Sequence, residues 1–146
     1  MNGYVKRARS AFSLIELMIV IVIIAILAAV MIPRYLDHSR RGYESGLKHN
    51  LSQLRTVIAT YEADTGYFPK QLTDLSSTAA PAQGYDSTGT LQNIAVSDWH
   101  GPYVGSVPPD TITGTPWVYS VAAPTVGVVV SSATGNDLTG VAFSTY

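Results

Sequence analysis

The sequence predicts an α+β fold in which one long, kinked N-terminal α-helix packs against a small antiparallel β-sheet head. Three observations lead to this prediction. Sixteen apolar residues follow one another without interruption from Leu17 to Ile32. Apolar residues then recur at helical spacing from Tyr43 to Tyr61, and residues 67–146 hold short β-prone segments separated by Pro and Gly.

The apolar segment is long enough to cross a membrane. From Phe12 to Pro33 it has twenty-two residues, which as a helix extend about 33 Å, close to the roughly 30 Å of a hydrocarbon core. Glu16 lies inside its front edge, where a charge costs at most about 2.5 to 3.5 kcal/mol on insertion scales. Eleven Leu, Ile and Val residues behind it each contribute about 0.3 to 0.6 kcal/mol. Residues 12–33 are therefore predicted to span a membrane.

The basic residues Lys6, Arg7 and Arg9 precede this segment, an arrangement also typical of a secretory signal peptide. Three features argue against that alternative. The apolar run is at the long end for such a signal, no clean small-x-small cleavage site precedes Pro33, and Glu16 has no role in an ordinary leader. The pattern favours a membrane-spanning helix with a cytoplasmic amino end.

A second helical half, residues 34–66, continues the first. Pro33 removes a backbone donor, so we expect a kink near residues 29–33. The helical pattern then resumes as one apolar stripe, and it halts at residues 64–66, before Pro69. The stripe consists of Tyr43, Leu47, Leu51, Leu54, Ile58 and Tyr61.

The head, residues 67–146, is predicted to contain a helical turn at residues 72–77 and an irregular stretch at residues 76–89. Short consecutive strands favour an antiparallel sheet, and the apolar stripe of the helix would cover one face of it. The predicted strands are residues 91–96, 116–121, 125–131 and 141–145.

Composition excludes several function classes. Nine basic and ten acidic residues argue against a nucleic-acid binder, which usually has a basic excess. The absence of cysteine from the sequence excludes disulfides and thiolate chemistry. Three scattered histidines, with no nucleophile elbow, phosphate loop or zinc motif, argue against an enzyme. Beyond Lys70 the only charged residues are five Asp. A solvated acidic surface is the favoured interpretation of these residues, ahead of a cation site.

The stretch AFSLIELMIVIVIIAILAAVMIPRY resembles the amino-terminal region of type IV pilins and of type II secretion pseudopilins, over about the first sixty-five residues. The elements that carry the resemblance are a short basic leader, the small residue Ala11, an acid at the fifth place from Phe12, and a proline at the twenty-second. The resemblance implies a pilin-like fold and a precursor whose leader, residues 1–11, is removed by a prepilin peptidase. It implies cleavage between Ala11 and Phe12 and methylation of the new amino group of Phe12.

The chain departs from the family at two positions. Ala11 stands where Gly is usual before the cut, which is compatible with slower processing, and Ala25 stands where many relatives have a Gly that loosens the helix. Ala25 and Ala29 are four residues apart and share a helix face. Small residues on one face let neighbouring helices approach closely, so these two alanines are candidates for helix packing.

Glu16 is the candidate assembly residue. An unpaired carboxylate in lipid is costly and usually finds a cation or a proton. Cleavage after Ala11 would create a cation, the amino group of Phe12, at the same depth. If subunits stack with a stagger, Glu16 of one subunit can meet this amine in another. We expect the pair to specify register more than to add stability, because desolvation offsets much of the attraction.

Two stretches of the head, DTGYFPKQLTDL and WHGPYVGSVPPDTITGTPWVYS, resemble the major pseudopilin and its close pilin relatives. The second match is partial, because Trp117 falls later than the usual tryptophan. Relatives with a calcium site take its ligands from the loop near the last strands. Asn136 and Asp137 are the nearby candidates here, and a solvated turn without metal is the favoured interpretation.

The resulting functional hypothesis is a structural subunit of a helical pseudopilus or pilus, with a slight preference for a type II secretion pseudopilin over a surface pilin. The implied partners are further copies of the chain, the prepilin peptidase, an inner-membrane assembly platform, minor pilins or pseudopilins, and the membrane. The implied location is the inner membrane with a periplasmic head, and then a filament. A signal-anchored periplasmic binding module and a secreted adhesin are the alternatives.

Overall fold

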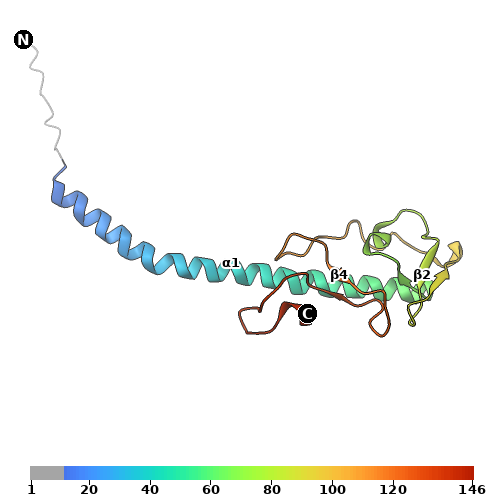
Figure 1. Ribbon diagram of the computed structural model, residues 1–146. Helices are drawn as coiled ribbons and strands as arrows, with labels where there is room; N and C mark the ends of the chain where they lie inside the picture. Colours follow the sequence, from blue (N-terminus) through green and yellow to red (C-terminus); the bar gives the residue numbers. More distant parts are fainter. Residues whose placement is uncertain (1–11) are drawn as a thin grey trace, which may run out of the picture. The chain divides into compact units, whose positions relative to one another are not determined.

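The computed structural model describes residues 12–146, apart from the side chains of Pro33 and Leu36. A single α-helix in this range, α1, runs from Leu14 to Thr65 (Figure 1). The chain divides into two compact units, the first ending at Arg40 and the second comprising Arg41–Tyr146. The predicted leader, residues 1–11, lies outside the described residues.

The helical assignment continues through Pro33, which therefore does not end α1. A proline inside a helix removes one backbone hydrogen bond, but the turns on either side can continue the ladder. The predicted kink at Pro33 stays a prediction.

The predicted apolar stripe is confirmed along most of the second half of α1. Five of its six members are at most 3% exposed: Leu47, Leu51, Leu54, Ile58 and Tyr61. The prediction is wrong for Tyr43, which is 59% exposed. Glu44 is buried in place of Tyr43, because it lies three residues before Leu47 and therefore on the same helix face as the stripe. Its carboxylate Oε1 accepts a hydrogen bond from the amide of Leu138 at 3.0 Å.

The helix ends where the sequence predicts. Gly66 has a φ of +76° and its amide donates to the carbonyl of Glu62 at 2.7 Å. Glycine reaches this left-handed conformation without steric cost, which is why it commonly follows the last helical residue.

Three short antiparallel strands form one sheet, in the order β1 (Phe68–Pro69), β2 (Gln83–Tyr85) and β3 (Leu91–Asn93). Strand β3 lies within a predicted strand, but β2 lies in the stretch predicted to be irregular. Gly84 explains the error. A Cβ atom there would lie 2.7 Å from the carbonyl oxygen of Phe68, so the close packing requires glycine. Glycine normally disfavours strands, and the sequence therefore did not indicate one here.

A second sheet pairs β4 (Val118–Tyr119) with β5 (Val129–Val130), antiparallel and inside two predicted strands. The fourth predicted strand, at residues 141–145, is wrong. Phe143–Thr145 form the 3₁₀-helix η3, and one isolated bridge joins Asn136 to Ala142. Burial of the Phe143 side chain in the core, at 5% exposure, turns this segment inward instead of along a sheet edge.

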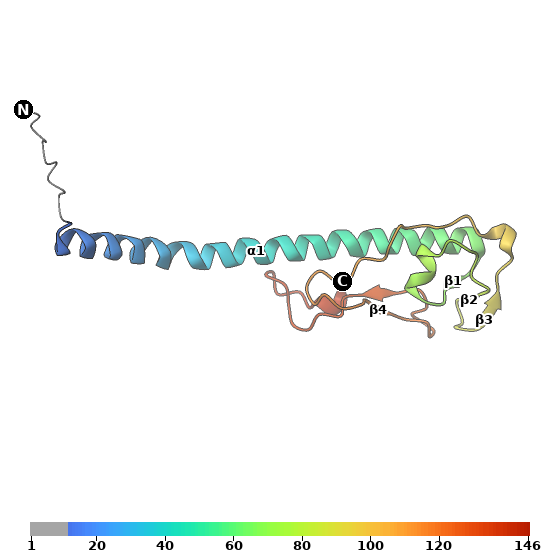
Figure 2. The ribbon, with the colours of Figure 1, turned by 90° about the horizontal axis from the view of Figure 1, so that it is seen from above.

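Two other 3₁₀-helices complete the head: η1 (Leu72–Ser76), which confirms the predicted helical turn, and η2 (Val96–Asp98). The two sheets lie along the C-terminal half of α1, as Figure 2 shows. The buried stripe of α1 packs there against side chains from throughout the head, so the prediction that this stripe covers the head is confirmed. These partners include Leu75, Ile94, Trp117, Val129 and Phe143.

Candidate functional site

The first unit presents a continuous apolar surface. Its large apolar side chains from Phe12 to Ile32 are between 47% and 77% exposed. By length and composition this part of α1 is able to cross a membrane, and none of its most apolar window is buried within the chain. Such a surface is unfavourable in water, because burying one Val, Leu or Ile is worth about 1.5 to 3 kcal/mol. The segment therefore requires lipid or other protein around it.

Glu16 lies in the first turn of α1. Its Oε2 accepts a hydrogen bond from the backbone amide of Ser13 at 2.8 Å. Ser13 precedes the first helical residue, so Glu16 stands at the third helical position and reaches back to the N-cap, which is one half of a capping box. The negative charge also complements the positive end of the helix dipole. A carboxylate has a second oxygen, and Oε1 can accept from another donor.

This role of Ser13 was not among the sequence predictions, although the pattern Ser-x-x-Glu at the start of an apolar helix is a capping-box signal. Phe12 and Glu16 are four residues apart in the sequence, at the start of the apolar surface. Ala25 and Ala29 are both exposed further along the same unit. Ala11, on the other side of the predicted cut, lies outside the described residues.

In the head, Asp137 is the centre of a hydrogen-bonded cluster. Its Oδ2 accepts from the Lys48 ammonium at 3.2 Å and from the Tyr146 hydroxyl. Its Oδ1 accepts from the amide and hydroxyl of Thr139 and from the amide of Val141. The Tyr146 hydroxyl, followed by that of Thr139, holds the pKa of Asp137 well below its ordinary value. The cluster fastens the C-terminal segment to α1 through Lys48.

These contacts bear on the calcium candidates. Both carboxylate oxygens of Asp137 are already bonded to donors of the chain, and Asn136 takes part in the backbone bridge to Ala142. Within residues 12–146, no three His, Asp or Glu side chains are grouped so that they could hold a metal ion. Calcium at Asn136 and Asp137 stays a weak prediction.

Asp110 is a second buried carboxylate, 1% exposed. Its Oδ2 accepts from the Ser131 hydroxyl at 2.6 Å and the Ser132 amide at 2.9 Å. Its Oδ1 accepts from the Ile112 amide at 2.8 Å. Burial opposes ionisation, but these bonds outweigh it and lower the pKa of Asp110. The side chain thus joins its own loop to the end of β5.

A third carboxylate, Asp86, holds the turn between β2 and β3. Its Oδ1 accepts from the hydroxyl and amide of Thr88 and from the amide of Thr90, and its Oδ2 accepts from Gln92. The Thr88 hydroxyl is the largest cause that lowers the pKa of Asp86, to about 2. This carboxylate is therefore ionised wherever the hairpin is intact near neutral pH.

We expect the head to lose stability as the pH falls from about 4 to about 2. A carboxyl group whose pKa is lower in the folded state than in the unfolded chain stabilises the fold above its unfolded pKa, here near 3.8 for Asp86. That contribution is lost as the pH falls through the folded pKa. Asp86, Asp110 and Asp137 all shift in this direction. Thermal unfolding of the head, followed by circular dichroism between pH 7 and pH 2, measures the effect.

Asp86→Asn provides the matched control for this prediction. Asparagine keeps an acceptor oxygen for the Thr88 and Thr90 amides but has no proton to gain. Its melting temperature should fall less steeply between pH 4 and pH 2 than that of the parent protein. Equal slopes for the two proteins would contradict the role assigned to Asp86.

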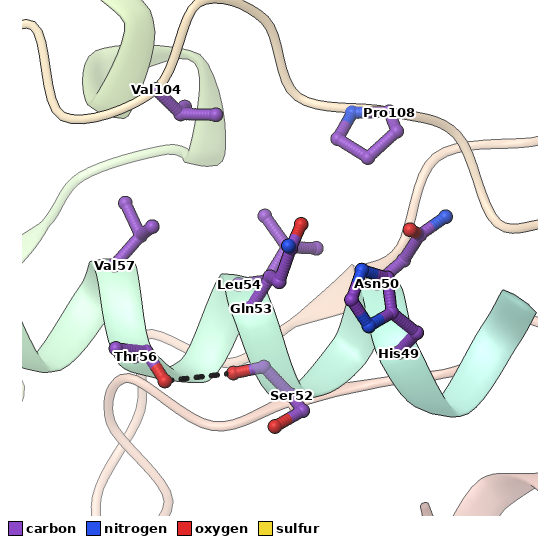
Figure 3. Close-up of a pocket in the computed structure, with 9 residues that line it drawn as sticks. All are labelled: His49, Asn50, Ser52, Gln53, Leu54, Thr56, Val57, Val104 and Pro108. Carbon is purple, nitrogen blue, oxygen red and sulfur yellow. Dashed lines mark hydrogen bonds between the residues drawn. The ribbon is translucent and has the colours of Figure 1, made fainter.

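A groove lies beside α1 in the head, with a volume of about 450 Å³. One wall is the helix from His49 to Val57, and the other carries Val104 and Pro108. Figure 3 shows Val57 and Leu54 pointing from the helix toward this second wall. The groove holds no ionised carboxylate, lysine or arginine among its lining residues, which suits an apolar occupant better than a charged ligand.

Comparison with known protein families finds one match, at the start of the chain. Residues 6–32 match the model of the prokaryotic N-terminal methylation motif. This range includes the basic residues Lys6, Arg7 and Arg9, as well as Ala11, Phe12, Glu16 and all of the apolar surface from Phe12 to Ile32.

Several known proteins are similar over longer stretches. A type II secretion system core protein G from Aeromonas hydrophila is 28% identical over 104 residues, which cover 67% of this chain and 73% of that protein. A type IV major fimbrial protein FimA from Dichelobacter nodosus is 36% identical over 91 residues, 57% of this chain and 56% of that protein. The fimbrial protein EcpC from Eikenella corrodens is 39% identical over 64 residues, 44% of this chain and 42% of that protein. No solved structure gives a significant match.

Proposed function

Because this chain belongs to the family of type IV pilins and type II secretion pseudopilins, we propose that it is cut between Ala11 and Phe12, methylated on Phe12 and polymerised into a helical filament. Members of this family are structural subunits, and this chain is accordingly one and not an enzyme. The observation that carries the proposal is the exposed apolar surface of residues 14–32 with one acid, Glu16, at its start.

The apolar surface explains why such a subunit would lie first in a membrane and later in a filament. Before assembly the segment would lie in the inner membrane, with the leader in the cytoplasm and the head in the periplasm. In the filament, neighbouring helices would replace lipid tails around it, at little hydrophobic cost because both surroundings are apolar. An inner-membrane platform and minor subunits would guide this transfer.

Glu16 would set the register of the subunits. Its bond to Ser13 holds the carboxylate at the helix start, where the amino group of a processed Phe12 would also lie. In a staggered stack, the remaining acceptor capacity of the carboxylate is available to the amine of a neighbouring subunit. Each subunit would then supply one positive and one negative group, and an incorrect stagger would leave both of them unpaired in an apolar core.

Within the family we favour a type II secretion pseudopilin. The similarity to core protein G covers 67% of this chain and so extends into the head. A type IV surface pilin is the second candidate, because the fimbrial proteins show higher identity over shorter stretches. Deletion of the gene separates the two: lost protein export supports the pseudopilin, and lost surface fibres support the pilin.

The mature amino terminus tests the proposal against a signal-anchored binding module and a secreted adhesin. We expect mass spectrometry of the protein from its host to show a chain that begins at methylated Phe12. Deletion of the prepilin peptidase should restore residues 1–11 and abolish the methyl group. An intact Met1 in the wild-type host would support the anchored module, and a start beyond Pro33 would support the adhesin. Either result would overturn the filament proposal.

A further inference from the structure

The turn at residues 137–141 is fastened to α1 by two charged side chains of the helix. Glu44 and Lys48 are four residues apart on α1, so both can face the same side. The Lys48 ammonium donates to Oδ2 of Asp137 at 3.2 Å, and Oε1 of Glu44 accepts from the amide of Leu138 at 3.0 Å. Adjacent residues of the turn are therefore held by a cation and by an anion of α1.

Asp137 has its full complement of hydrogen-bond donors, and its side chain is 0% exposed. Oδ2 accepts from the Lys48 ammonium and the Tyr146 hydroxyl. Oδ1 accepts from the Val141 amide and from the amide and hydroxyl of Thr139. An ionised carboxylate has about four lone-pair sites, so these donors occupy all of them. Lys48 is the one donor among them that carries a positive charge, and it is therefore the counter-ion of this buried carboxylate.

Tyr146 holds the ammonium in place. The Nζ atom of Lys48 lies 4.6 Å from the centroid of the Tyr146 ring, a distance at which the face of the ring attracts a cation. The same ring lies 6.4 Å from that of Phe143, which belongs to the core. The contacts with Tyr146 and then with Asp137 raise the pKa of Lys48, so the ammonium remains charged near neutral pH. The cation is thus part of the packing of the head.

A calcium ion does not fit beside Asp137. Calcium takes roughly six to eight oxygen ligands at about 2.3 to 2.6 Å, so an ion on this carboxylate would lie close to the Lys48 ammonium and displace several donors. Two cations that share one carboxylate repel, and the repulsion grows as their separation falls. Asn136, the second calcium candidate, has its backbone in the bridge to Ala142. The residues that suggested calcium in the sequence are thus arranged around a cation that the chain itself supplies.

We propose that the ammonium of Lys48 is the cation of this loop and takes the place of a bound calcium ion. The inference goes beyond the filament function and does not rest on it. A bound ion stabilises a fold only as far as its concentration exceeds its dissociation constant, whereas an ammonium on α1 is present in every copy of the chain. The head should therefore keep residues 137–146 against α1 in surroundings that contain no calcium.

Thermal unfolding of the full chain in detergent micelles, followed by circular dichroism, tests the first consequence. We expect the same melting temperature in excess EGTA and in millimolar calcium chloride, because a ligand shifts the transition only if it binds the folded state more tightly than the unfolded one. A melting temperature that rises with calcium concentration and reaches a plateau would overturn the inference, since it would show an ion bound to the folded head.

Removal of the ammonium tests the second consequence. Methionine keeps the unbranched stem of lysine and is a good helix former, and the Lys48 side chain is 47% exposed, so Lys48→Met should fold. It leaves Asp137 buried without its counter-ion, so the turn should open more often. We expect the amides of Leu138 and Val141 to exchange hydrogen about tenfold or more faster than in the parent, in EGTA and in calcium alike. Lys70→Met, the same change at an exposed lysine outside this cluster, should exchange like the parent.

A double variant shows whether Lys48 acts through Asp137. Asp137→Asn removes the charge of the carboxylate but keeps an acceptor oxygen for the amides of Thr139 and Val141. Two substitutions that affect the same contact are not additive, so Lys48→Met should accelerate exchange much less in Asp137→Asn than in the parent. Equal effects in the two backgrounds would contradict the pairing of Lys48 with Asp137.

These outcomes are independent of the filament function. Parental exchange rates at Leu138 and Val141 in Lys48→Met, or stabilisation of the parent by calcium, would overturn Lys48 as the cation of the loop while leaving the subunit function untouched. Failure of the chain to be processed or to form filaments would overturn that function and leave the role of Lys48 in place.

Discussion

A Glu16→Gln subunit is expected to insert into the membrane and be processed, yet to assemble filaments about a hundredfold more slowly than the parent. Glutamine is similar in size to glutamate and can still accept the bond from the Ser13 amide, because a capping box uses either residue. The substitution thus removes the charge and keeps the helix cap. The amine of Phe12 in the neighbouring subunit would then be buried without a counter-charge, which costs about 3 kcal/mol or more. Because the pair would form as a subunit is added, this cost raises the barrier of addition and slows it by about two powers of ten.

The rate of filament formation, followed by electron microscopy or by shearing and quantifying filaments, measures this effect. Asp98→Asn is the matched control, since it removes one negative charge from an exposed position in the head and should leave assembly unchanged. If Glu16→Gln subunits, inserted and methylated, polymerise at the parental rate, the proposed pairing of Glu16 with Phe12 is wrong.

The Asp110→Ala substitution is expected to lower the free energy of unfolding of the head by about 3 kcal/mol or more. Truncation leaves the Ser131 hydroxyl and the amides of Ser132 and Ile112 without their acceptor. Each buried donor left unpaired costs about 1 to 3 kcal/mol. Because Asp110 joins its loop to the end of β5, the loss should affect the whole head and not only the loop.

Urea unfolding at pH 7 measures this difference, and the same substitution at Asp98 gives the control. Asp98 is exposed and its carboxylate accepts a bond from the adjacent Ser97 hydroxyl, so Asp98→Ala should change stability by less than about 0.5 kcal/mol. Similar unfolding midpoints for the two variants would show that the contacts of Asp110 contribute little to the stability of the head.

The elements that sequence analysis predicted well are those whose signal is local. The apolar segment, the end of α1 just before Gly66 and the buried stripe from Leu47 to Tyr61 follow from periodicity and from the properties of single residues. The capping contact between Ser13 and Glu16 was equally readable, because its two residues are three apart, and it was overlooked.

The errors concern residues whose place depends on distant parts of the chain. Tyr43 and Glu44 are adjacent, and helical periodicity favours the apolar one for burial, but the amide of Leu138 provides a partner for the carboxylate of Glu44. Strand β2 forms through Gly84 because Tyr67 and Phe68 pack against it. No pattern near residues 83–85 indicates these neighbours.

By itself, the sequence determined that this chain has a membrane-length apolar helix with one acid at its start, and thereby its resemblance to the pilins and pseudopilins. The tertiary structure decided which polar groups are buried in the head and which acceptors Lys48 and Arg55 contact. It also decided that an uncharged helix face with a groove beside it remains exposed on α1. The physical reason is the range of the interactions. Helix formation and membrane insertion depend on neighbours within a few positions, whereas the bond between Lys48 and Asp137 joins residues 89 positions apart and exists only once the head has folded.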